Sequence, residues 1–481
     1  MAKLAEIALA QKSVEEATVL LQRAVSVDPS PHRRVALIVH LQRSGEPAMA
    51  LAEIECLPRS VRRQSRIKEV EATVLSSLGR DERAIRLRKE IVRERPTEPK
   101  LWCTLANSLT TVGRLDEAVA ALVRATKQAP KSGEPWWHLS NLKSYKFSPA
   151  EIALMKQALM QASSDDDRLH IHFALGKAFE DARAFEESFR HYAAANAIGA
   201  SRFGENQTIT AQIDQSVALL TPEFFERNKG AGCNEAGPIF VVGVHRSGST
   251  LIEQILASHS MIEGIAELPV IANVCGRLER EMRMPAPRAI ASLPPSAFSE
   301  IGEEILEAFR PFRRTERPYF VDKKPGNWVC LGLVRVALPN ARIIDARRHP
   351  MACGFSNFKQ HYPKGVGFAS RLRTIGTFYQ DYWRFMNHFD RVQPGVVHRV
   401  VNEHLVSDPE HEIRTMLGYL GLPFEASCLE FHRNQRAVRT PSAEQVRQPI
   451  NSKGVEQWKN YEPWLGELKE ALGPALHHWN D

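Results

Sequence analysis

The sequence GVHRSGST at 243–250 follows the apolar run IFVVG at 239–243 and precedes the helical stretch LIEQILASH at 251–259. A strand, a tight glycine-containing loop and a helix in this order can bind an anion. The loop N–H groups converge on a phosphate, and the helix N-terminus adds partial positive charge. Gly248 lets the backbone approach a ligand closely, and the hydroxyls that follow it add donors. The stretch therefore predicts a phosphate-binding loop, and the alternative is a strand-to-helix turn without a ligand.

The loop differs from that of a nucleotide kinase, which has the pattern G-x-x-x-x-G-K-[ST]. The glycine spacing from Gly243 to Gly248 is kept, but Ser249 stands at the lysine position. Arg246 supplies a positive side chain inside the loop instead. Without that lysine, and without a recognisable aspartate for Mg²⁺, transfer of an ATP γ-phosphate is poorly supported.

The sequence after this loop alternates short β-branched runs with helical stretches. This alternation predicts a parallel sheet with right-handed crossovers, whose ligands bind at the carboxyl ends of the strands. We expect an α/β domain with a P-loop-like site over 237–481, preceded by a polar connector over 201–236. The expected strands are 239–243, 319–322, 342–346 and 396–401.

The first two hundred residues contain a repeat of 34 residues. Gly45, Gly79 and Gly113 share this spacing, as do Trp102 and Trp136. Such a period is the signature of tetratricopeptide repeats, whose helix pairs stack because one pair cannot bury its apolar face alone. We therefore expect a multidomain chain with an all-α tetratricopeptide superhelix over 1–200. Its groove would bind a peptide or protein; alternatively, the arm only packs on the second domain or mediates a homodimer.

The composition narrows the class of protein. Seven cysteines at wide spacings, with no C-x-x-C, argue against disulfides and a zinc site, so we expect a cytoplasmic protein and no metal. No run of 18 apolar residues occurs and the first residues lack a signal pattern, so we expect neither a membrane partner nor secretion. The net charge of +7 suits a phosphate- or sulfate-bearing ligand. No nucleic-acid partner is expected, because no basic stretch is interleaved with aromatic residues.

Four segments, in the same order, resemble the sulfotransferase superfamily. The likeness is to tyrosylprotein sulfotransferases and to bacterial proteins that fuse tetratricopeptide repeats to a sulfotransferase domain, and it covers roughly residues 237–465. The segments are PIFVVGVHRSGSTL at 238–251, IEGIAELPVI at 262–271, FVDKKPGNW at 320–328 and ARIIDARRHPMACGFSNF at 341–358.

This resemblance implies a donor, 3′-phosphoadenosine-5′-phosphosulfate (PAPS), and a hydroxyl acceptor. Its implied binding residues fall into two groups. Arg348 and Ser356 would bind the 3′-phosphate, for which the planar fork of arginine is suited. The loop would hold the 5′-phosphosulfate through Arg246, Ser247, Gly248, Ser249 and Thr250.

The resemblance also implies the catalytic residues. Glu267, 21 residues after Arg246, would be the general base on the acceptor hydroxyl. Lys323 would contact the sulfuryl and bridging oxygens, and Ser442 would contact the transferred group. Asn327 would help to position the site. With Arg246, these residues would need no metal.

Two residues depart from the family pattern. Asn402 stands where tyrosine is usual, and Gln457 stands where a basic residue is usual, so that Lys453 or Lys459 would have to supply that charge. These departures keep open an alternative function, a repeat-based interaction scaffold with a degenerate, nucleotide-binding domain. The acceptor also stays open among a protein tyrosine, a small phenol, a sugar and a lipid hydroxyl, although the repeat arm favours a peptide or protein.

Overall fold

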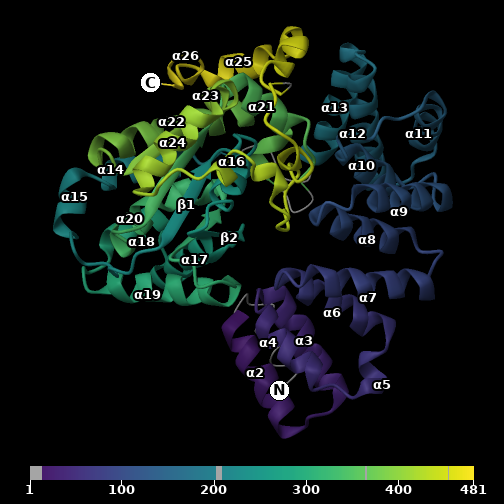
Figure 1. Ribbon diagram of the computed structural model, residues 1–481, viewed down its shortest axis with the longest axis horizontal. Coiled ribbons are helices and arrows are strands. Elements are labelled where there is room, and N and C mark those ends of the chain that lie inside the picture. The colour runs from purple at the N-terminus through teal and green to yellow at the C-terminus, as the bar shows by residue number, and fades with distance from the viewer. Residues whose placement is uncertain (1–13, 202–207, 363–365, 453, 481) are drawn as a thin grey trace. The chain divides into compact units, whose positions relative to one another are not determined.

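A computed structural model describes residues 14–201, 208–362, 366–452 and 454–480 (Figure 1). The chain divides into two compact units, Met1–Leu142 and Lys143–Asp481. Within the described ranges, none of the helices combines the length and the apolar character that crossing a membrane requires.

The first unit is built from helices in its described part. They bury one apolar face each, with Leu41, Ala50, Leu75 and Ala84 among the fully covered side chains. The helices are α2 (Val14–Val27), α3 (Pro31–Ser44), α4 (Pro47–Glu55), α5 (Arg59–Arg62), α6 (Ser65–Ser77), α7 (Asp81–Glu94), α8 (Pro99–Thr111), α9 (Leu115–Gln128) and α10 (Gly133–Asn141).

The glycines of the 34-residue period occupy identical turns. Gly45, Gly79 and Gly113 have φ angles of 86°, 65° and 83°, which favour glycine. In each turn the next N–H donates to a carbonyl five positions back: Glu46 to Leu41 at 2.9 Å, Arg80 to Leu75 at 2.7 Å and Arg114 to Leu109 at 2.9 Å. The sequence period is therefore a structural repeat of helix hairpins.

The tryptophans of the repeat are equivalent as well. Trp102 Nε1 donates to the Pro96 carbonyl at 2.9 Å, and Trp136 Nε1 donates to the Pro130 carbonyl at the same distance. Each tryptophan thus fixes the loop that leads into its own helix. The assignment of these hairpins to the tetratricopeptide class stays a prediction.

The second unit begins with helices α11 (Pro149–Gln161), α12 (Asp165–Asp181) and α13 (Phe185–Ala200), followed by α14 (Thr210–Leu219) and α15 (Pro222–Arg227). The turn between α12 and α13 repeats the glycine geometry with Arg183, whose φ is 59°. We expected this pair to belong to the repeat domain, up to residue 200. It falls in the second compact unit instead, because Ser188 contacts Tyr461 (Oγ to Oη, 2.9 Å) and Asn196 Nδ2 donates to the Phe358 carbonyl at 2.6 Å.

Five parallel strands form the sheet, in the order β2-β3-β1-β4-β5. The four strands expected from the sequence are confirmed. The fifth, β2, was missed because IEGIA is short and contains glycine, which weakens a strand pattern. The strands are β1 (Pro238–Gly243), β2 (Ile262–Ala266), β3 (Tyr319–Lys323), β4 (Arg342–Arg347) and β5 (Val397–Val401).

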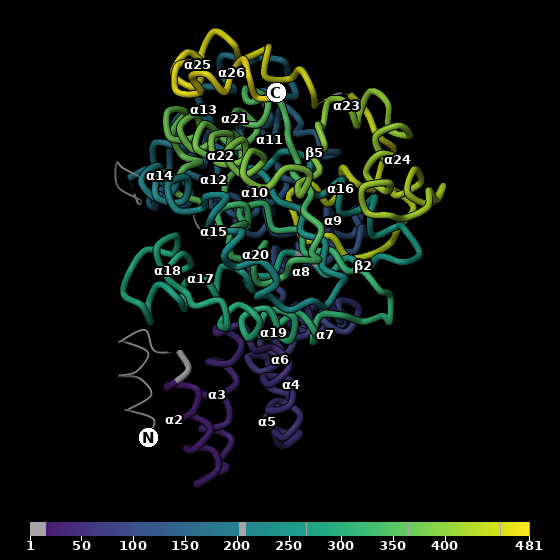
Figure 2. The backbone as a smooth tube through the Cα atoms, turned by 90° about the vertical axis from the view of Figure 1, so that its left-hand side faces the viewer, coloured from purple at the N-terminus to yellow at the C-terminus, as the bar shows by residue number. Residues whose placement is uncertain are grey.

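Helices cover both faces of this sheet. On one face Val241 and Ile344 pack with Ile252 and Met416, which belong to α16 (Ser249–Leu256) and α24 (Pro409–Leu420). Figure 2 shows these two helices on one side of β5 and α21 and α22 on the other. The remaining helices are α17 (Val270–Met282), α18 (Ala286–Ser292), α19 (Ala297–Phe309), α20 (Leu331–Ala337), α21 (Pro350–Phe358), α22 (Leu372–Val392), α23 (Asn402–Ser407), α25 (Gly466–Leu472) and α26 (Ala475–His478).

The close contact of α12 with α13 depends on a glycine. A Cβ atom on Gly176 would lie 2.6 Å from two ring carbons of Tyr192, which is fully covered. We predict that Gly176→Ala lowers the free energy of unfolding by about 1–3 kcal/mol, the usual cost of overpacking, although alanine is the better helix former.

Gly418→Ala is the matched control, because that glycine is exposed in α24 and its Cβ would meet nothing within 4 Å. It should be neutral or stabilising by up to about 1 kcal/mol. Urea unfolding of both variants checks the prediction, and equal stabilities would contradict the described packing.

Candidate functional site

The carboxyl ends of the five strands bring most of the predicted site residues to one edge of the sheet. The loop 244–248 follows β1, Glu267 follows β2, and Lys323 ends β3. Arg348 follows β4 directly, and Asn402 follows β5. This edge is where open parallel sheets bind their ligands, so the topology alone gathers residues that are far apart in sequence.

The loop after β1 has the backbone of an anion-binding turn. Gly248 has a φ of 99° and caps the N-terminus of α16. A Cβ atom there would lie 2.6 Å from Asn402 Oδ1, so no larger residue fits without movement. Arg246 has a φ of 70°, a left-handed conformation that costs free energy in a residue other than glycine. The loop is therefore held in a strained form that presents its N–H groups at a helix N-terminus.

Arg246 connects three segments through its guanidinium group. Its Nε donates to Ser356 Oγ at 3.1 Å, and one terminal nitrogen donates to Ser442 Oγ at 3.0 Å. Arg348 donates to the backbone carbonyl of Arg246 at 3.1 Å and to that of Gly454 at 2.6 Å. The residues predicted to bind two ends of one ligand thus form a single hydrogen-bonded group.

This group carries positive charge, and Glu403 is the carboxylate whose charge acts on Arg348. Across the described ranges, neither Arg246 nor Arg348 forms an ion pair, whereas the adjacent Arg347 is paired with Asp345 at 2.8 Å. Burial, with Arg246 as a neighbouring cation, lowers the pKa of Arg348. An anion bound beside these two arginines would be stabilised by both.

Among the buried polar atoms that lack a hydrogen-bond partner within the described ranges, two belong to this group. They are the hydroxyl of Ser247, a residue only 2% exposed, and Nε of Arg348. Buried polar groups are normally hydrogen-bonded, because an unmade bond costs about 1–3 kcal/mol. Both atoms are donors, as the oxygens of a phosphate or sulfate require. The residues present therefore fit an oxyanion ligand.

Lys323 and Glu267 form the second group. The Lys323 ammonium contacts Glu267 Oε1 directly and lies 3.7 Å from Glu253 Oε2. Lys323 is 1% exposed, whereas the Glu267 side chain is 39% exposed. The pair thus combines a buried cation with a carboxylate that solvent or an acceptor can reach.

Asp322 holds the backbone next to Glu267. Its carboxylate accepts hydrogen bonds from the Leu268 N–H at 3.3 Å and from Asn327 Nδ2 at 2.9 Å. Burial raises the pKa of Asp322 to about 7. Asn327 was expected to position the site, and in the structure it supports the aspartate that fixes the segment after β2.

His245 lies near both groups. The charges of Glu267, Lys323 and Arg246 all act on its ring, while burial lowers its pKa to about 4. The imidazole is therefore neutral at neutral pH. The sequence analysis did not single out this residue, because a loop histidine without a partner in the sequence gives no signal.

Thr250 and Ser249 lie at the start of α16, where both are buried. Thr250 Oγ1 is 3.2 Å from Thr440 Oγ1, in the segment that also carries Ser442. This contact holds the segment that contains Thr440 and Ser442 against α16.

Gln457 is hydrogen-bonded to Glu180 and Lys359, whereas Lys453 or Lys459 was expected to supply the basic group at this position. Its Nε2 donates to Glu180 Oε1 at 2.8 Å, and Lys359 donates to both Gln457 Oε1 at 2.7 Å and Glu180 Oε2 at 3.0 Å. Lys459 is instead paired with Glu456 on the surface, and Lys453 lies outside the described residues. Lys359, which the sequence analysis missed, therefore supplies the basic group beside position 457.

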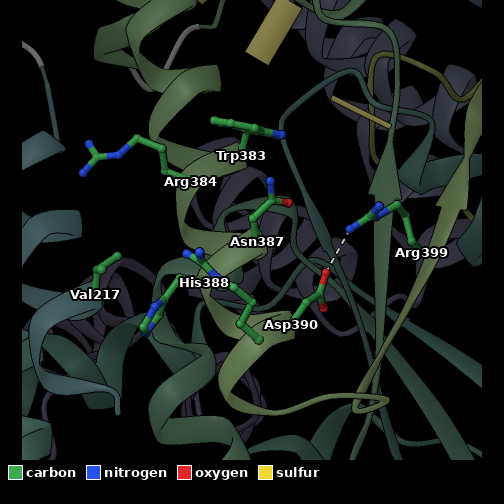
Figure 3. Close-up of a pocket in the computed structure, with 8 residues that line it drawn as sticks. Val217, Trp383, Arg384, Asn387, His388, Asp390 and Arg399 are labelled. Atoms are coloured by element: carbon green, nitrogen blue, oxygen red, sulfur yellow. Dashed lines mark hydrogen bonds and ion pairs between the residues drawn. The ribbon is translucent and has the colours of Figure 1, made fainter. Parts of the chain in front are cut away.

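A hollow of about 660 Å³ lies between α14, α22 and β5 (Figure 3). Two of the three arginines that line it have carboxylate partners: Arg384 is paired with Asp214 at 2.7 Å and Arg399 with Asp390 at 2.9 Å, whereas Arg391 is exposed. Within the described ranges no group of three or more His, Cys, Asp or Glu residues is arranged to hold a metal ion. Arg246 and Arg348, half-buried arginines that form no ion pair in the described parts of the chain, lie at the edge of the sheet and not in this hollow.

Part of the second unit matches a known protein family. Residues 238–426, which include the loop, Glu267, Lys323 and Arg348, match the sequence model of the sulfotransferase family. They form a sulfotransferase-family domain. An uncharacterised protein of Aquifex aeolicus is 29% identical over 392 residues, which are 78% of this chain and 50% of that protein. The chain thus spans half the length of this relative.

Three of the solved structures with similarity to the chain are named as sulfotransferases or sulfotransferase domains. The sulfotransferase domain of the curacin biosynthetic pathway is 18% identical, with a TM-score of 0.35 over 47% of this chain and 91% of that chain. The sulfotransferase domain of the Synechococcus PCC 7002 olefin synthase is 19% identical, with a TM-score of 0.35 over 47% and 88%. A sulfotransferase of Mycobacterium tuberculosis is 13% identical, with a TM-score of 0.29 over 65% and 98%.

The sulfotransferase domain contains a buried ion pair that the sequence analysis missed. Glu253, on α16, is 2% exposed and lies 2.9 Å from an Arg436 nitrogen, besides its contact with Lys323. Removing one partner of a buried pair leaves the other charge uncompensated. We predict that Glu253→Gln lowers the free energy of unfolding by about 3 kcal/mol.

Glu410→Gln is the matched control, because Glu410 pairs with Arg414 on an exposed face of α24. That change should cost less than about 1 kcal/mol. Chemical denaturation of both variants provides the comparison, and a Glu253 variant as stable as the control would show that the buried pair is not needed.

Proposed function

We propose that the chain transfers a sulfuryl group from PAPS to a hydroxyl acceptor. The observation that carries the proposal is the pair of arginines, Arg246 and Arg348, which meet at the phosphate-binding loop without a carboxylate partner. Such a site suits a ligand with several negative charges, and PAPS carries a phosphosulfate at one end and a phosphate at the other.

The loop and Arg246 would hold the 5′-phosphosulfate, together with Ser247, Gly248, Ser249 and Thr250. Arg348 and Ser356 would hold the 3′-phosphate. The hydrogen bond from Arg246 to Ser356 supports this division, because it sets the distance between the two binding groups. The donor would then be held in one register, which is a large part of what group transfer requires.

Glu267 would accept the proton of the acceptor hydroxyl as its oxygen attacks sulfur. Lys323 would stabilise negative charge on the sulfuryl oxygens and the leaving phosphate, with Ser442 and Arg246. The contact between Lys323 and Glu267 supports this assignment, because it puts the base and the cation side by side at the ends of neighbouring strands.

For the acceptor we propose a peptide or protein hydroxyl, such as a tyrosine. The proposal rests on the helix-hairpin repeats of the first unit, an architecture that elsewhere binds peptides on its concave surface. A phenol with a pKa near 10 would need a base at neutral pH, which Glu267 supplies.

Donor binding and turnover should respond separately to two variants. We predict that Glu267→Gln binds adenosine 3′,5′-bisphosphate, the product nucleotide, with unchanged affinity but loses about 100-fold or more in sulfuryl transfer, a typical effect of removing a general base. Arg348→Ala should instead weaken binding of this nucleotide about 10-fold or more, because a charged hydrogen-bonding group is lost.

Calorimetry with the product nucleotide and transfer of labelled sulfate to proteins of a cell lysate measure the two effects. Wild-type turnover in the Glu267 variant would refute the base assignment. Nucleotide binding by the wild type without transfer to any acceptor would instead favour a scaffold with a nucleotide-binding domain.

A further inference from the structure

A lysine outside the sulfotransferase family segments lies at the same site. Lys143 is the first residue of the second compact unit and precedes α11. Its backbone N–H donates to Glu444 Oε2 at 2.6 Å, and Glu444 is only 5% exposed. Since Glu444 is two residues from Ser442, which Arg246 contacts, this bond holds the Lys143 backbone against the segment that contacts Arg246.

Three cations act on the charge of the Lys143 ammonium. They are Arg246, from the loop after β1, Lys359, from the end of α21, and Lys177, from α12. Glu180 of α12 is the carboxylate that acts on it in the opposite direction.

That carboxylate is already engaged elsewhere. Glu180 accepts hydrogen bonds from Lys359 and Gln457, and Lys177 is paired with Asp181. Within the described ranges the Lys143 ammonium itself forms no hydrogen bond or ion pair. Lys146, three residues further along, pairs with Asp181.

We propose that Lys143 binds the donor nucleotide, by donating to a phosphate oxygen that Arg246 also contacts. This inference rests on the proposed function. The chemistry favours an oxyanion of the nucleotide, because Lys143 is bound to Glu444, two residues from the Ser442 that Arg246 contacts, and because an anion between the two cations relieves their repulsion. A cation with no anionic partner, held in a half-buried position, otherwise costs stability.

Nucleotide binding should also change the protonation of Lys143. Burial, together with the neighbouring cations, lowers the pKa of Lys143 to about 7, so that part of the population is neutral at pH 7.5. An oxyanion beside the amine would raise the pKa again. Binding of the nucleotide at pH 7.5 should therefore take up protons at Lys143.

The test uses the full chain, with adenosine 3′,5′-bisphosphate as the probe and titration calorimetry at pH 7.5 in two buffers of different ionisation enthalpy. Lys143→Ala should weaken binding about 10-fold, as for the loss of one charged hydrogen bond, and should reduce the proton uptake. Lys143→Arg should bind nearly as tightly as the wild type but with reduced uptake, because arginine is already protonated. Lys146→Ala is the control, and should leave both quantities unchanged.

The outcomes separate this inference from the proposed function. If Arg348→Ala weakens binding while Lys143→Ala keeps wild-type affinity and proton uptake, Lys143 is not a ligand but the nucleotide site stands. If the wild type does not bind the nucleotide at all, both proposals fail. If Lys143→Ala and Lys146→Ala weaken binding equally, the effect is one of general surface charge and the assignment of Lys143 is wrong.

Discussion

The guanidinium group of Arg246 is the constraint on which the site depends. It joins the loop after β1 to Ser356 on α21 and to Ser442, which is far along the chain. The backbone carbonyl of Arg246 accepts a hydrogen bond from Arg348. These are neutral partners, so the arginines keep their charge available. The left-handed backbone of Arg246 is the local cost of this arrangement, and the surrounding contacts hold it in place. The binding free energy of a ligand with several negative charges would offset the strain of this loop.

The rest of the second unit supports this group from two sides. Parallel pairing puts the ends of all five strands on one edge, so that Lys323 and Glu267 lie at the ends of neighbouring strands. Helix α12, which is not part of the sheet edge, contributes Glu180, which accepts hydrogen bonds from Lys359 and Gln457. The helix pair α12–α13 therefore belongs to the second compact unit, although its turn has the geometry of the preceding repeats.

Local signals in the sequence were enough for much of this structure. The 34-residue spacing predicted the hairpins because each glycine takes a backbone conformation that other residues avoid. The loop and four strands followed from apolar runs bounded by glycine or charge. What the sequence could not show were contacts between distant segments whose partners have no characteristic spacing, such as Glu253 with Arg436 or Lys359 with Gln457. The helix period likewise could not show that α13 packs on residues near 461, because both partners lie on ordinary amphipathic surfaces.

The most direct test of the central claim is a crystal structure of the chain soaked with adenosine 3′,5′-bisphosphate. The account predicts one phosphate on the N–H groups of the loop 244–248 within reach of Arg246, and the other phosphate at Arg348 and Ser356. Well-ordered crystals with no nucleotide density at either place, or with the nucleotide bound only away from the edge of the sheet, would contradict it.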